Sequence, residues 1–173
     1  MTAVSLKKIL SDANKNNYAV AGLVVLAWDD ALAFTKAADE TGVPIILQAG
    51  PSCRAHTPVP ILGKMFRYLA SQTKTHVCCH IDHGYTLREC AEGIDSGFTS
   101  VMFDGSKLSL KENIKTTLKI VKRAHDAKVS VEGEIGFVGY ANGKSSEGTL
   151  ANEAVTFAKE SNVDAMAVSV GNT

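Results

Sequence analysis

Several features that would indicate particular classes of protein are missing from this sequence. No apolar run approaches the roughly 18 residues that a membrane-spanning helix needs, and the first ten residues lack the apolar core of a signal peptide. The 18 basic and 18 acidic residues cancel, so no net charge favours a nucleic-acid or membrane surface. The four cysteines include no C-x-x-C pair, which argues against a thiolate zinc site. We therefore expect a cytoplasmic protein with free thiols and no nucleic-acid or membrane partner.

What the sequence does contain is a regular alternation of apolar and amphipathic segments. Its 173 residues, 45% hydrophobic and 21% charged, suit one globular domain covering residues 1–173. Short runs that are apolar on both faces predict buried parallel strands at 18–26, 43–47, 76–81, 100–103, 129–131 and 165–170. Amphipathic stretches predict helices at 5–15, 28–40, 58–72, 87–96, 110–127 and 152–161.

Alternating strands and helices form a parallel sheet with right-handed crossovers, which is either a closed barrel or an open doubly wound sheet. No G-x-G-x-x-G follows the first strand, which disfavours a dinucleotide-binding open sheet. A complete eight-stranded barrel usually needs about 250 residues. We predict an α/β fold, a parallel (β/α)8 TIM barrel of which only about the first six βα units are present, so that the chain stops about two units early.

Polar side chains recur where the predicted strands end. In a parallel barrel, functional groups gather at the carboxyl ends of the strands. One such residue could simply cap a helix, but recurrence at four or five ends predicts a shared polar site on one rim. The residues are Gln48, the segment His80-Ile81-Asp82-His83-Gly84, Asp104, the segment Glu132-Gly133-Glu134, and Asn172.

The third strand end is the most distinctive of these segments. Imidazole and carboxylate groups suit a metal such as zinc, and Asp82 and His83 can both reach one site because strand alternation stops there. For His80 we favour a different role, as a hydrogen-bonded histidine of the barrel interior.

The same segments resemble a known family. The run from His80 to Gly84 resembles the H-x-D-H signature of class II aldolases, and residues 97–106, 131–136 and 163–171 resemble later segments of that family in the same order. The sequence is therefore similar to the class II (zinc-dependent) fructose- or tagatose-bisphosphate aldolases over most of its length.

This resemblance implies roles for particular residues. Asp82 would be the catalytic acid/base and His83 a zinc ligand. Glu134 would lie near the metal, as a possible secondary site, and Asp104 would contact a metal ligand rather than the metal. The family's two other histidine ligands would lie beyond Thr173. From their places at strand ends, Gln48 and Asn172 are candidate substrate-binding residues.

The implied activity is the cleavage or formation of a phosphorylated ketose. A ketose 1,6-bisphosphate would give dihydroxyacetone phosphate and an aldehyde such as glyceraldehyde 3-phosphate, with Zn²⁺ or another divalent metal as cofactor. The metal would stabilise the enediolate as a Lewis acid, and a carboxylate would take the proton of the hydroxyl on the released carbon. Fructose and tagatose substrates remain equally open, and a homodimer or homotetramer is expected.

Two alternatives to this activity remain. One is a catalytically silent or divergent barrel that is retained for binding or assembly. The other is a different metal-dependent barrel lyase. Metal content would separate the first alternative from an aldolase, and product analysis would separate the second.

Overall fold

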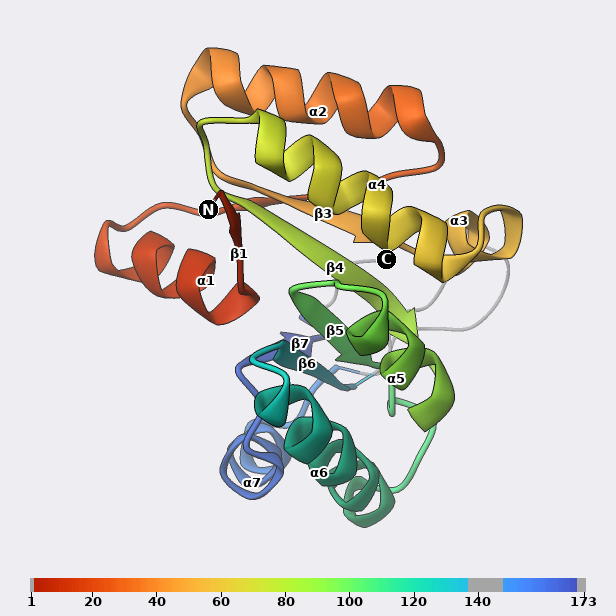
Figure 1. Cartoon of the computed structure of the whole chain (residues 1–173). Coiled ribbons are helices and arrows are strands. Elements are labelled where there is room, and N and C mark those ends of the chain that lie inside the picture. The colour runs from red at the N-terminus through yellow and green to blue at the C-terminus, as the bar shows by residue number, and fades with distance from the viewer. Residues whose placement is uncertain (1, 137–147, 171–173) are drawn as a thin grey trace.

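The computed structural model describes residues 2–136 and 148–170. Strands and helices alternate along these residues (Figure 1). In chain order they are β1 (Ala3–Val4), α1 (Leu6–Lys15), β2 (Ala21–Val24), α2 (Trp28–Thr41), β3 (Ile45–Ala49), α3 (Pro51–His56), α4 (Val59–Gln72), β4 (Val77–Gly84), α5 (Leu87–Asp95), β5 (Ser100–Phe103), α6 (Leu110–Asp126), β6 (Ser130–Ile135), α7 (Ala151–Ser161) and β7 (Ala165–Val168).

The sheet is parallel, and its strands follow one another in chain order from β2 to β7. The two-residue strand β1 pairs with Val77 and Cys78 at the start of β4. In an open doubly wound sheet, by contrast, the strand order reverses at a switch point. The strand order therefore confirms the predicted fold, a partial βα-barrel. It argues against the alternative of an open doubly wound sheet.

The helices cover one face of this sheet. Along the series α2, α4, α5, α6 and α7, each helix packs against the next and against a strand of the sheet. On β4, Val77, Cys79 and Ile81 pack into the core beneath the helices. Because side chains alternate along a strand, Cys78 and His80 point to the opposite, concave face.

Helix α1 closes the amino-terminal end of that concave face. Leu6 and Ile9 on α1 are buried against Ile46 and Cys78, which lie near the start of their strands. Ser5 caps the helix by accepting a hydrogen bond from the Lys8 N–H. With this end covered, the opposite rim is where the polar strand ends can form a site.

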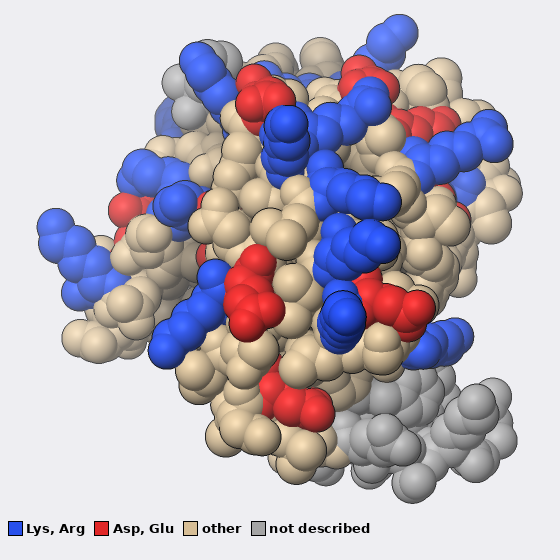
Figure 2. All heavy atoms as spheres, turned by 90° about the horizontal axis from the view of Figure 1, so that it is seen from below, with Lys and Arg blue, Asp and Glu red and all other residues tan. Residues whose placement is uncertain are grey.

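Helix α6 shows how the sequence pattern produces these elements. Its apolar positions Ile114 and Val121 are buried, and its lysines at 111, 115, 119 and 122 are exposed. The Ser109 hydroxyl accepts the Glu112 N–H, as the capping-box pattern predicts. Figure 2 shows that this side of the molecule carries basic side chains with acidic ones among them, as expected for a solvated surface.

Some boundaries differ from the sequence prediction. Strand β2 is shorter than the apolar run 18–26 and is largely exposed, because β3 is its only strand neighbour among the described residues. Strand β4 continues through His83 to Gly84. Helix α3 lies where a loop was expected, and β1 was not predicted. No helix in the described parts of the chain is long and apolar enough to cross a membrane.

Candidate active site

The end of β4 departs from regular strand geometry. Its pairing register with β5 shifts between Ile81 and Gly84, and His83 has a φ of 52°. Residues other than glycine seldom adopt this left-handed conformation, and such strained positions cluster at functional sites. The interruption allows the consecutive residues Asp82 and His83 to serve one site.

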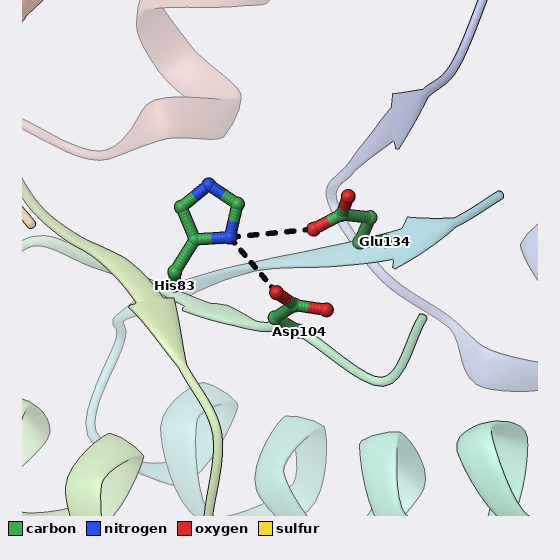
Figure 3. A group of neighbouring side chains, drawn as sticks. All are labelled: His83, Asp104 and Glu134. Atoms are coloured by element: carbon green, nitrogen blue, oxygen red, sulfur yellow. Dashed lines mark hydrogen bonds and ion pairs between the residues drawn. The ribbon is translucent and has the colours of Figure 1, made fainter. Parts of the chain in front are cut away.

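His83 lies beside carboxylates from the two following strand ends (Figure 3). Its Nδ1 is 2.9 Å from Oδ2 of Asp104, which follows β5, and 3.4 Å from Oε2 of Glu134 on β6. These three side chains form the one group of histidine, cysteine and acidic residues with metal-binding spacing among the described residues. The structure thus brings together three predicted site residues.

The hydrogen bond assigns different roles to the two ring nitrogens of His83. An ionised carboxylate can only accept a hydrogen bond, so Nδ1 must donate its proton to Asp104. Figure 3 shows the other nitrogen, Nε2, on the side of the ring away from both carboxylates. A histidine held in this way by a carboxylate is the usual arrangement of a metal-ligating imidazole.

The charges around His83 favour a cation. The hydrogen bond to Asp104, with the Glu134 carboxylate 3.4 Å away, raises the pKa of His83 to about 10. Burial opposes ionisation of Asp104, but His83 and the Ser106 hydroxyl and N–H outweigh it and bring the pKa of that carboxyl to about 2. The Nδ1 side of the His83 ring therefore faces the negative charge of the Asp104 carboxylate.

Glu134 provides a test of whether a metal would fit. Its Oε2 is buried and has no hydrogen-bond partner in the described structure. A buried carboxylate oxygen without a donor is costly. A cation on the Nδ1 side of the ring, separate from the position that Nε2 faces, would offset that cost. The donor set of imidazole and carboxylate oxygens also suits zinc or a similar divalent ion.

Asp82 lies next to this group, with Gln48 beside it. Nε2 of Gln48 is 3.5 Å from Oδ1 of Asp82, so the predicted substrate-binding and catalytic residues are neighbours. Burial raises the pKa of Asp82 above its ordinary value, although His83 and Arg54 oppose the shift. A carboxylate with a raised pKa is a better general base near neutral pH.

His80 is an interior histidine, as expected. It is 1% exposed, its Nδ1 lies 2.9 Å from the Ser100 hydroxyl, and its Nε2 lies 3.4 Å from Glu132. Burial lowers the pKa of His80 to about 3, so the ring is neutral at pH 7. Burial, with Asp82 and Glu134 nearby, raises the pKa of Glu132 to about 7. These two residues lie deeper along their strands than the group around His83.

One predicted site residue is not described by the structure, and one contact residue was not predicted. Asn172 lies outside the described residues. Arg54, which was given no role from the sequence, donates hydrogen bonds to main-chain carbonyls of Asp82 and His83. The signal that could have revealed it is Pro51 after Gly50, because proline is favoured in the first turn of a helix.

The partial βα-barrel thus places a carboxylate-supported histidine and an adjacent aspartate together at its strand ends. Residues 4–173 match the family described as fructose-bisphosphate aldolase class-II. The chain belongs to this family, which confirms the resemblance seen in the sequence.

Individual relatives agree with this assignment. The chain is 34% identical over 180 residues to 6-phospho-5-dehydro-2-deoxy-D-gluconate aldolase of Shouchella clausii, covering 99% of this chain and 61% of that protein. It is 34% identical over 202 residues to fructose-bisphosphate aldolase class 2 of Synechocystis sp., covering 100% and 55%. The YdjI aldolase of Escherichia coli K12 superposes with a TM-score of 0.90 at 26% identity, covering 99% and 63%. The chain therefore spans little more than half the length of its relatives.

Proposed function

We propose that this chain carries the Asp82–His83 part of the active site of a metal-dependent aldolase that cleaves or forms a phosphorylated ketose. The observation that carries the proposal is the bulged end of β4. There a half-buried aspartate precedes a histidine whose Nδ1 is held by Asp104 and whose Nε2 faces away from the carboxylates.

His83 would hold Zn²⁺ or another divalent ion through Nε2. When bound, the ion would act as a Lewis acid on the substrate carbonyl and stabilise the charge of the enediolate. Asp104 and Glu134 would fix the orientation of the ring from behind, and Glu134 could also contribute to a secondary cation position. A catalytic zinc normally has three protein ligands, so one imidazole alone should bind zinc weakly.

Asp82 would move the proton. In the cleavage direction its carboxylate accepts the hydroxyl proton of the carbon that becomes the aldehyde, the carbon–carbon bond breaks, and its electron pair remains on the enediolate. Gln48, 3.5 Å from Asp82, is placed to orient this carboxylate or a substrate hydroxyl. Asp82 is already partly buried. Further exclusion of water from the site would strengthen the electrostatic interactions of Asp82 with Gln48 and with the substrate.

The experiment is a metal and cleavage assay on the complete enzyme, in its wild-type form and as two variants, because one imidazole alone should bind zinc weakly. Fructose 1,6-bisphosphate, tagatose 1,6-bisphosphate and 6-phospho-5-dehydro-2-deoxy-D-gluconate are the substrates, and zinc content is measured on the same samples. His83→Ala should lose zinc and cleavage together, whereas Asp95→Ala, which removes an exposed partner of Arg123, should change neither.

The outcomes separate the alternatives. Zinc that stays bound in His83→Ala would place the metal elsewhere. A complete wild-type protein that binds zinc but cleaves none of these compounds would favour the catalytically silent barrel, and cleavage of a different phosphorylated compound would favour another lyase. The cytoplasmic location and the homodimer or homotetramer stay predictions, and light scattering of the purified chain measures the latter.

A further inference from the structure

Helix α3 directs one arginine at the ends of two strands. The helix starts directly after β3, with Gly50 as its N-cap and Pro51 in its first turn. Arg54 lies one turn further along. Its Nη1 donates to the carbonyl oxygens of Ala49, at the end of β3, and of Asp82, and its Nη2 donates to the carbonyl oxygen of His83 at 2.9 Å.

These contacts fall where β4 is irregular. The β4–β5 ladder pairs Ile81 with Val101 and resumes only at Gly84 and Phe103, so Asp82 and His83 lie within the shift. His83 is also in the left-handed region, with a φ of 52°. Such a conformation persists only where surrounding contacts enforce it, and the guanidinium of Arg54 contacts the carbonyls of both residues.

Arginine is particularly suited to this contact. Its planar guanidinium carries several N–H donors in a fixed arrangement and remains charged at all relevant pH values. Lysine would keep the charge but would present a single ammonium group without that fixed fork. The planar shape, and not the charge alone, is therefore what can hold three carbonyl oxygens of two strands at once.

We propose that Arg54 is a positioning residue that holds the end of β4 in the conformation in which Asp82 and His83 serve the same site. The effect of Arg54 on metal binding rests on the proposed function, whereas the effect of Arg54 on the backbone of His83 does not. Helix α3, which was not among the predicted helices, is thereby part of the support of the site.

The first readout needs no metal. We compare wild-type chain, Arg54→Met, Arg54→Lys and the surface control Arg123→Met by NMR, using backbone chemical shifts and couplings that report the φ angle of His83. Wild type and Arg123→Met should show a positive φ at His83. Both Arg54 variants should lose it, because neither side chain reproduces the fork. Arg54 variants that are folded and keep His83 in the left-handed region would overturn the proposal.

The second readout is a zinc titration followed through the ring signals of His83, which detects weak binding. Loss of a group that holds a metal ligand typically weakens affinity by about 10- to 100-fold, and we expect a reduction of this size in both Arg54 variants. Unchanged affinity in folded variants would contradict the proposal. If wild type itself binds no zinc at His83, the proposed metal site fails, and the backbone readout still decides the role of Arg54.

Folding is checked in the same samples by circular dichroism. If Arg54→Met is unfolded, Arg54→Lys supplies both readouts. Loss of folding in both variants would mean that the whole fold requires Arg54. That result would overturn its assignment as a residue that positions the site.

Discussion

Gly105, in the turn that follows β5, should not tolerate a methyl group. A Cβ at this position would lie 2.1 Å from Oδ1 and 2.4 Å from Cγ of Asn113, which is buried on α6. Gly105 is not among the residues with positive φ, so alanine meets no backbone strain there. The side chain of Asn113 would have to move, and its hydrogen bonds would be lost.

The cost follows from those hydrogen bonds. Asn113 Nδ2 donates to the main-chain carbonyl of Glu134 at 2.8 Å, and its Oδ1 accepts from the Thr117 hydroxyl at 3.1 Å. Each buried polar group left without a partner costs about 1–3 kcal/mol, so two cost about 2–6 kcal/mol. The lower chain entropy of unfolded alanine offsets about 0.4–1 kcal/mol. Gly105→Ala should therefore reduce the free energy of unfolding by about 1–5 kcal/mol.

Thermal unfolding followed by circular dichroism measures this effect. At about 2–4 °C per kcal/mol for a chain of this size, the Tm should fall by roughly 2–20 °C. Gly148→Ala is the matched control, because within the described part of the chain no atom beyond its chain neighbours lies within 4 Å of its added Cβ, and its effect should stay within about 1 kcal/mol. In an Asn113→Ala background, Gly105→Ala should cost much less, because the clash is gone. An unchanged Tm, or equal costs in both backgrounds, would refute the reasoning.

Two further predictions concern acid stability and thiol reactivity. Burial opposes ionisation of Asp164, but the Val131 N–H, His125 and Lys7 outweigh it and lower the pKa of that carboxyl. Its stabilising contribution is therefore present above the unfolded pKa of about 3.9 and is lost as the pH falls through the lower folded pKa. Between pH 5 and the onset of acid unfolding, Asp164→Asn should show a smaller loss of unfolding free energy than wild type. An equal loss would contradict this assignment. All four cysteines are free and buried, and burial raises the pKa of each thiol. A thiol reagent should label them slowly in the native chain and rapidly in denaturant, and rapid native labelling would be inconsistent with this burial.

The strand and helix pattern could be predicted because it depends on local apolar periodicity. The shared site could also be predicted, since the carboxyl ends of parallel strands meet at one rim, and the structure does bring His83, Asp104 and Glu134 together. The orientation of His83 could not be predicted. Which ring nitrogen faces Asp104 depends on the register shift in β4 and on a backbone conformation that the surrounding contacts impose.

The missed elements have equally physical causes. Helix α3 has six residues, too few to show helical periodicity, so no helix was predicted around Arg54. Strand β1 has two residues and exists only through its pairing with the start of β4. The apolar residues of β2 suggested a buried strand, yet Val24 is 54% exposed because burial depends on neighbouring strands and not on composition.

The most direct test of the central claim is to measure zinc occupancy and cleavage rate on the same sample of the complete enzyme carrying Asp82→Ala. A general acid/base typically contributes about 10²- to 10⁴-fold in rate, so the account predicts a loss of this size with zinc still bound as in wild type. Low turnover that excess zinc fully restores would instead make Asp82 a residue that only orients His83. Near-normal turnover of Asp82→Ala would contradict the account.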